Sequence, residues 1–235
     1  MAAMAGSRPL PCAAQGQQAP AFAAPQPPIS DLDRTMTRGT QLGPEAKAAA
    51  EAGIEAMGKS NFAAAETAFE KLLKLSPGNI NGLINLGLAE FRLGRAEEAR
   101  KYLKEAIRVK PDAALAWMML GVISMNDRDH EEATAELAEA VYLNPNSPQA
   151  HNYFAVTLAQ RGWDSAAEDE LRKVIELDPN FAEAQFNLAV LYLQQSPPAV
   201  ELARRHYQKA LELGARPDAD MAAKLAAAPA GDTVP

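Results

Sequence analysis

ALAWMMLGVISMNDRDHEEATAELAEAVYLNP, residues 114–145, contains two apolar stripes with helical spacing, separated by a polar break. The stripe of the first half, at i, i+3, i+4 and i+7, is Trp117, Leu120, Gly121 and Ser124. The stripe of the second half is Ala133, Leu137 and Ala140. Both spacings place the side chains on one face of a helix, and Pro145 cannot continue the helix before it. The stretch therefore predicts a helical hairpin.

The same pattern recurs along the chain with a period of 34 residues. It is clearest at four prolines, Pro77, Pro111, Pro145 and Pro179. Small residues share a second register, at Gly53, Gly87, Gly121, Ala155 and Ala189, and a third, at Ala65, Ala99, Ala133 and Ala167. Because so many positions share one period, we predict a single array of two-helix units, in which the small residues let paired helices approach closely.

The repeated pattern resembles that of the tetratricopeptide repeat (TPR) family: a large residue, then Leu-Gly, Ala, an apolar residue, Ala and Pro at fixed offsets. The copy before the quoted stretch carries it as Leu83, Leu86, Gly87, Ala99, Leu103, Ala106 and Pro111. The resemblance covers residues 46–215. It implies an all-α fold, a right-handed α-solenoid of about five TPR helical hairpins with a C-terminal capping helix.

The register divides a TPR domain, residues 44–228, into five repeats and a terminal helix. The expected repeats are residues 46–79, 80–113, 114–147, 148–181 and 182–215, with the capping helix at 217–228. The first repeat is degenerate, because Ala49 and Ala52 replace large residues. The fifth gains two residues in Ser196-Pro197-Pro198, an insertion that a loop absorbs at small entropic cost.

The two ends of the chain lack apolar periodicity. Residues 1–43 are rich in Pro, Ala and Gln, a composition that cannot bury enough apolar surface to fold, so we expect disorder there and in residues 229–235. The small-residue segments 13–15 and 21–23 resemble sequence found after signal cleavage. They slightly favour export to the periplasm of a bacterium; otherwise we expect a cytoplasmic protein.

The overall composition excludes several classes of protein. The net charge of −7 argues against a nucleic-acid or anionic-lipid partner. The longest apolar run, residues 113–125, is too short to span a membrane. Cys12 is the only cysteine, so no internal disulfide can form. We therefore expect a soluble protein without a membrane span.

No motif in the sequence predicts catalysis. The histidines His130, His151 and His206 lack a second ligand at metal-binding spacing, and no phosphate loop or nucleophile motif is present. We interpret His151, in the register of Trp117, as a half-buried packing residue. We expect no catalytic residue, no metal, no cofactor and no enzymatic activity.

The first helix of each repeat has a second stripe, which faces away from its sister helix and should line the concave surface of the solenoid. Its members are the predicted peptide-binding residues: Asn85, Leu88, Phe91, Arg92, Met118, Met119, Val122, Met125, Asn152, Tyr153, Val156, Phe186, Asn187 and Val190. We expect about half of the apolar ones to fill seams between repeats and the rest to be exposed. Methionines in particular suit a surface that adapts to varied partners.

The resemblance to the TPR family suggests two ways in which this groove could bind a peptide. Some TPR proteins hold a C-terminal carboxylate with a clamp of Lys, Asn and Arg; here Asn85 and Arg92 are present but the lysines are absent. Others hold a peptide backbone with a ladder of asparagines. Asn85 and Asn187 match the ladder positions, whereas Met119 and Tyr153 interrupt it. The resemblance thus favours a groove that is largely apolar.

The sequence favours a non-enzymatic scaffold that docks a peptide or an amphipathic helix of a partner protein in the concave groove. The alternative is an accessory or assembly factor of a bacterial envelope or secretion complex. The identity of the partner and the oligomeric state stay open at this stage.

Overall fold

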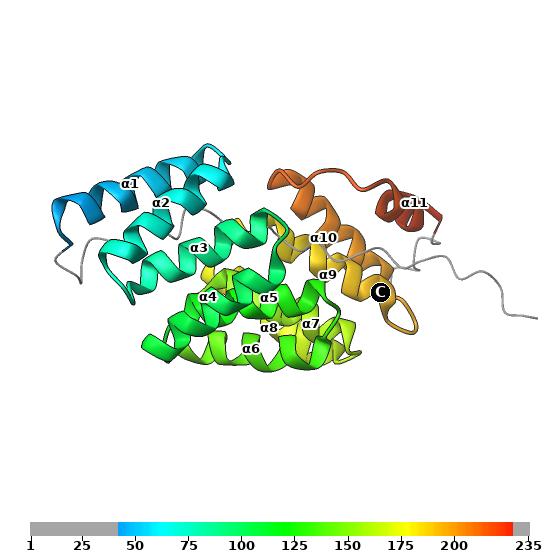
Figure 1. Ribbon diagram of the computed structural model, residues 1–235. Helices are drawn as coiled ribbons and strands as arrows, with labels where there is room; N and C mark the ends of the chain where they lie inside the picture. Colours follow the sequence, from blue (N-terminus) through cyan, green and yellow to red (C-terminus); the bar gives the residue numbers. More distant parts are fainter. Residues whose placement is uncertain (1–41, 228–235) are drawn as a thin grey trace, which may run out of the picture.

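The computed structural model describes residues 42–227 of the chain, and within them it contains eleven α-helices and no strand (Figure 1). The helices are α1 Pro44–Gly58, α2 Phe62–Leu75, α3 Ile80–Arg92, α4 Ala96–Val109, α5 Ala114–Asn126, α6 His130–Leu143, α7 Pro148–Gln160, α8 Asp164–Leu177, α9 Ala182–Gln194, α10 Val200–Glu212 and α11 Ala219–Ala227. The segments predicted to be disordered lie outside the described residues, except Leu42 and Gly43. Leu42 contacts the core of the first repeat.

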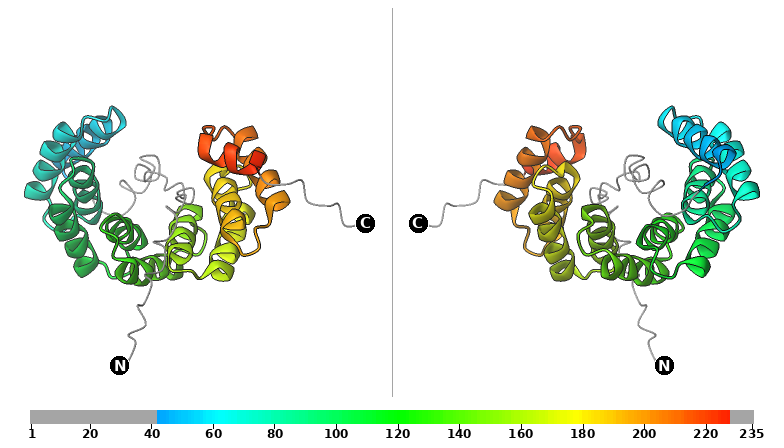
Figure 2. Two further views of the ribbon diagram at one scale, coloured as in Figure 1. Left: turned by 90° about the vertical axis from the view of Figure 1, so that its right-hand side faces the viewer. Right: turned by 90° about the vertical axis from the view of Figure 1, so that its left-hand side faces the viewer.

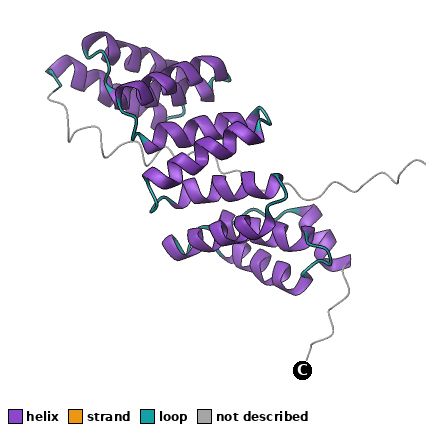
Figure 3. Ribbon diagram, turned by 90° about the horizontal axis from the view of Figure 1, so that it is seen from below, coloured by secondary structure: helices purple, strands orange, loops and turns teal. Residues whose placement is uncertain are grey.

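The helices pair as five hairpins, α1 with α2 through α9 with α10, and α11 follows the last. The hairpins succeed one another along an open arc, with α1 at one end and α11 at the other (Figure 2). The view from below shows only helices and short loops in the described part (Figure 3). The predicted all-α solenoid of five hairpins and a terminal helix is therefore confirmed.

Short loops of one conformation join the two helices in each of the first four hairpins. The residue two positions before each second helix begins has positive φ: Ser60 at 55°, Gly94 at 79°, Arg128 at 62° and Gly162 at 76°. Glycine adopts this left-handed conformation without strain, whereas a Cβ makes it costly. Asn61 and Asp129 then cap α2 and α6 with their side-chain oxygens. The fixed loop sets the hairpin angle in each repeat.

The two helices of a hairpin cross at the glycine register that the sequence predicted. A Cβ built on Gly121 would lie 2.5 Å from Leu137 Cγ, and one on Gly87 would lie 3.0 Å from Leu103 Cγ. The nearest neighbour is thus a leucine of the second helix rather than the small residues Ala133 or Ala99. The alanines are fully buried. Close approach therefore depends on one small residue facing a large one.

The odd-numbered helices form the inner layer of the arc. From repeat to repeat α3 contacts α5, α5 contacts α7 and α7 contacts α9, whereas no comparable contact joins successive even-numbered helices. Helices on the inside of a curved stack must lie closer together than those on the outside. The first helix of each repeat therefore lines the concave side.

The fifth repeat absorbs its two extra residues in the loop between α9 and α10. This loop spans residues 195–199, and Ala199 N donates to Tyr192 O at 2.9 Å to close it. Tyr207 and Ala210 are consequently buried at the positions that Leu171 and Val174 occupy in the fourth repeat. Helix α11, two residues shorter than predicted at its start, buries Met221 and Leu225 against this last hairpin.

None of the described helices combines the length and the apolar character needed to cross a bilayer.

Candidate functional site

The fourteen predicted binding residues all lie on helices of the inner layer. Asn85, Leu88, Phe91 and Arg92 belong to α3; Met118, Met119, Val122 and Met125 to α5; Asn152, Tyr153 and Val156 to α7; and Phe186, Asn187 and Val190 to α9. These helices are the first helices of repeats two to five, as the repeat register predicted.

The expectation that about half of the apolar candidates are exposed is wrong. Only Phe91 and Arg92 are partly exposed, and the other twelve candidates are buried. Even the methionines expected at the surface of the groove are covered: Met118 is 6% exposed and Met125 is 9% exposed. The reason is that α5 and α7 each pack against four neighbours, namely the sister helix, the preceding second helix and the inner helices on both sides, and that α3 and α9 each pack against three. Little of such a helix can face solvent.

Candidates from three successive repeats nevertheless meet in one apolar cluster. Met118, Val122 and Met125 of α5 contact Tyr153 and Val156 of α7 within it. Its partly exposed margin is formed by Phe91, Leu115, Trp117, Val141 and Phe154. Phe186 and Val190 belong to a separate cluster of the last two repeats. The candidates of α5 and α7, with Phe91 of α3, thus form a central apolar region that is partly exposed at its margin.

The asparagines of the inner layer bond within the protein. Asn85 Nδ2 donates to Asn81 O at 2.9 Å, and Asn187 Nδ2 donates to Asn152 Oδ1 at 3.0 Å. Asn152 is fully buried, and its Nδ2 has no hydrogen-bond partner in the structure. A buried donor without an acceptor costs about 1–3 kcal/mol. Asn152, which lies outside the predicted ladder register, therefore has an amide donor on the inner layer that no acceptor among residues 42–227 satisfies.

His151 is buried rather than half-buried, and both of its ring nitrogens have polar partners. Its Nδ1 lies 2.5 Å from Glu170 Oε2 and its Nε2 lies 3.0 Å from Pro145 O. The Pro145 carbonyl and the ionised Glu170 carboxylate are both acceptors, an arrangement that favours the doubly protonated ring. The hydrogen bond to the Glu170 carboxylate raises the pKa of His151 above its usual value. Trp117, in the same register one repeat earlier, donates its Nε1 to Pro111 O at 2.9 Å.

A polar network joins the second and third repeats. Arg100 of α4 donates to Ser124 Oγ at 3.1 Å and to Asp127 Oδ2 at 2.7 Å. Ser124 in turn donates to Glu136 Oε2 at 2.6 Å. Glu136 is buried, and burial raises the pKa of its carboxyl. These polar residues bond to one another, which makes the network a structural contact between repeats.

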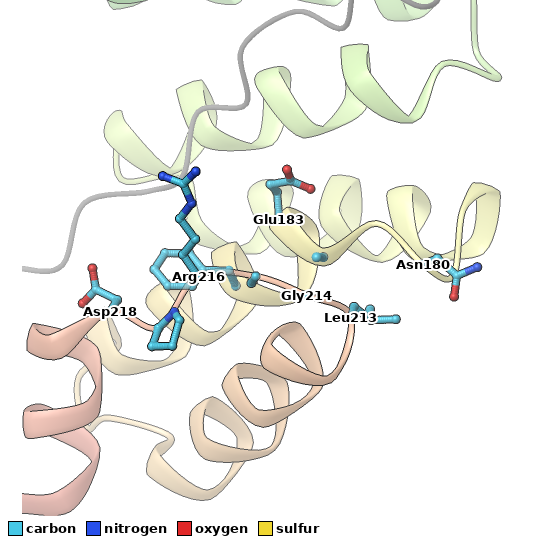
Figure 4. Close-up of a pocket in the computed structure, with 10 residues that line it drawn as sticks. Asn180, Glu183, Leu213, Gly214, Arg216 and Asp218 are labelled. Carbon is cyan, nitrogen blue, oxygen red and sulfur yellow. The ribbon is translucent and has the colours of Figure 1, made fainter.

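A pocket that the sequence pattern did not reveal lies at the C-terminal end of the inner layer (Figure 4). Its volume is about 590 Å³, and its lining consists of Asn180, Ala182, Glu183, Phe186, Leu213, Gly214, Ala215, Arg216, Pro217 and Asp218. Six of these ten residues, Leu213 to Asp218, belong to the loop between α10 and α11, which follows the last repeat. A search based on the repeat period could not find it, because the loop has no counterpart in the other repeats.

The described residues offer no metal centre: no group of three or more His, Cys, Asp or Glu side chains within residues 42–227 could hold an ion.

The curated proteins that resemble this chain match it over only part of their length. Over 77 residues the chain is 35% identical to the cellulose synthase 1 operon protein C of Komagataeibacter xylinus. The match covers 32% of this chain and 6% of that protein. A second cellulose synthase operon protein C of the same organism is 37% identical over 65 residues, which cover 28% of this chain and 5% of that protein. The chain therefore spans only a small part of these relatives.

Solved structures share the fold over most of the chain. A crystal structure of MamA protein is 24% identical with a TM-score of 0.59, and the match covers 72% of this chain and 91% of the other. PilF of Pseudomonas aeruginosa is 18% identical with a TM-score of 0.67, over 74% and 78% of the two chains. Family models described as tetratricopeptide repeat match residues 50–108, 84–151 and 170–212. With five helical hairpins in the predicted register, the chain belongs to the tetratricopeptide repeat family.

Proposed function

We propose that this protein is a non-enzymatic scaffold that holds a peptide or an amphipathic helix of a partner protein along the inner layer of the solenoid. Arrays of tetratricopeptide repeats commonly bind other proteins. The observation that supports a particular binding region is the central apolar cluster of α3, α5 and α7. This cluster is the one region where candidates of three repeats are contiguous and where a partly exposed margin leads to them.

The margin is where a partner makes its first contact. Phe91, Leu115 and Phe154 are partly exposed and pack against the cluster that contains the buried Met118 and Met125. Methionine side chains are unbranched and adapt their shape, so they can repack when an apolar anchor of the partner enters. A backbone carbonyl of a docked segment could also accept from Asn152 Nδ2 and relieve its missing hydrogen bond.

Phe91 and Leu115 provide the test, because charged substitutions of the buried Met118 and Met125 would unfold the repeat rather than probe binding. Affinity capture from the native cell extract compares wild type with Phe91→Ser/Leu115→Ser. The control is Tyr142→Ser on α6, whose side chain is 79% exposed and outside the inner layer. A partner retained by wild type and control but lost by the double variant, at unchanged circular dichroism, supports the proposal. Equal capture by all three proteins contradicts it.

A second candidate function is that of an accessory or assembly factor of a bacterial envelope or secretion complex. It is favoured by the similarity to proteins named for a cellulose synthase operon and by the small-residue segments near the N-terminus. Mass spectrometry of protein purified from its native cells tests it. A mature N-terminus between residues 14 and 24, together with recovery in the periplasmic fraction, supports export. An unprocessed N-terminus in the cytoplasmic fraction contradicts it.

A further inference from the structure

The pocket beside α9 contains two opposite charges without partners among the described residues. Glu183, on the first turn of α9, is partly buried, and Arg216, on the loop after α10, is exposed. Neither makes a hydrogen bond or an ion pair with another residue of the described chain, nor with each other. In Figure 4 both side chains point to the same side of the loop. A carboxylate and a guanidinium thus stand at one opening without satisfying each other.

The walls of the pocket are held in place by contacts on their far side. The Phe186 ring packs edge-on against Tyr207, with ring centroids 6.1 Å apart. Tyr207 Oη donates to Asp218 O at 3.0 Å and accepts from Asp218 N at 2.8 Å. Asp218 Oδ1 also accepts from Met221 N at 2.7 Å and so caps α11. The loop is consequently anchored at Asp218, and the Phe186 ring is supported from behind by Tyr207.

This leaves Glu183 and Arg216 as the charges available to a ligand. Asp218 lines the pocket too, but its carboxylate is engaged by the backbone of α11. Phe186, Leu213, Ala215 and Pro217 supply apolar lining between the two charges. Ligand sites commonly combine such an apolar lining with a few fixed polar groups, in a volume of roughly 300–1,000 Å³.

We propose that this pocket binds a basic and an acidic side chain that lie close together on the docked partner segment, and so fixes its direction along the inner layer. The inference rests on the proposed function, because the pocket lies at the C-terminal end of the same layer. The basic group pairs with Glu183, the acidic group pairs with Arg216 in a bidentate manner, and the aliphatic stems of both lie on Phe186. A segment docked in reverse would place each charge against its like, which is repulsive.

Short blocked peptides test the pocket without knowledge of the partner. The probes are acetyl-Ala-Lys-Glu-Ala-amide and its analogues with Lys alone, Glu alone or neither charge. They are titrated into the full chain labelled with ¹⁵N, and amide shifts of residues 182–186 and 213–218 are followed by NMR. We expect the doubly charged peptide to bind about tenfold more tightly than either singly charged one, a difference of about 1.4 kcal/mol, because it makes two charge-assisted contacts instead of one. Equal binding of all four peptides, or shifts at none of these amides, overturns the proposal.

Variants of the two charges complete the test. Glu183→Gln and Arg216→Gln should each reduce the affinity for the doubly charged peptide to that of the singly charged ones. Glu212→Gln on α10 is the matched control, because Glu212 is exposed and pairs with Lys209 away from the pocket. The swap Glu183→Arg/Arg216→Glu should restore binding to acetyl-Ala-Glu-Lys-Ala-amide. If the charged peptides do not bind as expected but capture of the partner still requires Phe91 and Leu115, the pocket proposal alone is refuted. If the peptides bind as expected but capture does not require Phe91 and Leu115, the docking proposal is refuted.

Discussion

At the scale of single residues, two histidines of the array lie in environments that shift their pKa values in opposite directions. His151 faces two acceptors, and its bond to Glu170 raises its pKa. His206 donates from Nδ1 to Gln185 Oε1 and stacks on Tyr192, where burial lowers its pKa. The sequence predicted neither state, because Glu170 and Gln185 approach the rings from other helices and no local pattern records that.

The free energy of unfolding should contain a contribution from His151 that depends on pH. A histidine whose folded-state pKa is raised stabilises the fold fully below its unfolded value of 6.5 and loses this contribution as pH rises through the folded pKa. We expect the stability gap between wild type and His151→Gln to be largest at acidic pH and to shrink toward alkaline pH. Urea denaturation at several pH values measures it.

His206 provides the internal control for this experiment. Its lowered pKa has the opposite sign, so its contribution is present above pH 6.5 and is lost as pH falls through the folded pKa. In an NMR titration the ring proton signal of His151 should therefore move at higher pH than that of His206. Coincident titration of the two rings would show that the buried ion pair with Glu170 does not exist in solution.

At the scale of the helices, the crossing within each hairpin depends on the residue that faces the glycine. Gly121→Ala places a Cβ 2.5 Å from Leu137 Cγ, a distance that forces the helices apart, whereas Gly87→Ala meets Leu103 Cγ at 3.0 Å. Alanine favours a helix by about 1 kcal/mol over glycine, and overpacking costs about 1–3 kcal/mol. We expect Gly121→Ala to lower the unfolding free energy and Gly87→Ala to leave it nearly unchanged, as measured by urea denaturation.

The control for the crossing is Gly58→Ala in α1, where an added Cβ meets no atom within 4 Å. Helix propensity alone should then stabilise the protein by up to about 1 kcal/mol. If Gly121→Ala were as stabilising as Gly58→Ala, the close approach at Leu137 would not limit the packing of this hairpin.

The helices themselves could be predicted closely from the sequence, and the exposure of their inner faces could not. The 34-residue register located α2 through α10, because prolines and small residues mark helix ends and crossings directly. The burial of Met118 or Asn152 depends on how tightly successive repeats curve, which is a property of the stack. A stripe facing away from the sister helix can therefore still be covered by the next repeat.

At the scale of the whole molecule, a linear array has stability that varies along its length. Each repeat contacts only its neighbours, so each hairpin depends on the residues directly beside it. The N-terminal repeat has Leu42 against its core, and the C-terminal repeat has α11. Between these ends, contacts such as Arg100 with Ser124 and Asp127 couple one hairpin to the next.

Removal of α11 should therefore destabilise one end of the array and leave the other unchanged. Met221 and Leu225 are buried against the fifth repeat, and burial of such a side chain contributes about 1.5–3 kcal/mol. Arg204 also donates to Leu225 O at 3.0 Å. In a variant that ends at Arg216, amide hydrogen exchange should become much faster in α9 and α10 and should stay the same in α1 to α4. Acceleration spread evenly over the described helices would mean that the array unfolds as one cooperative unit, so that the loss of a terminal helix is felt at every repeat.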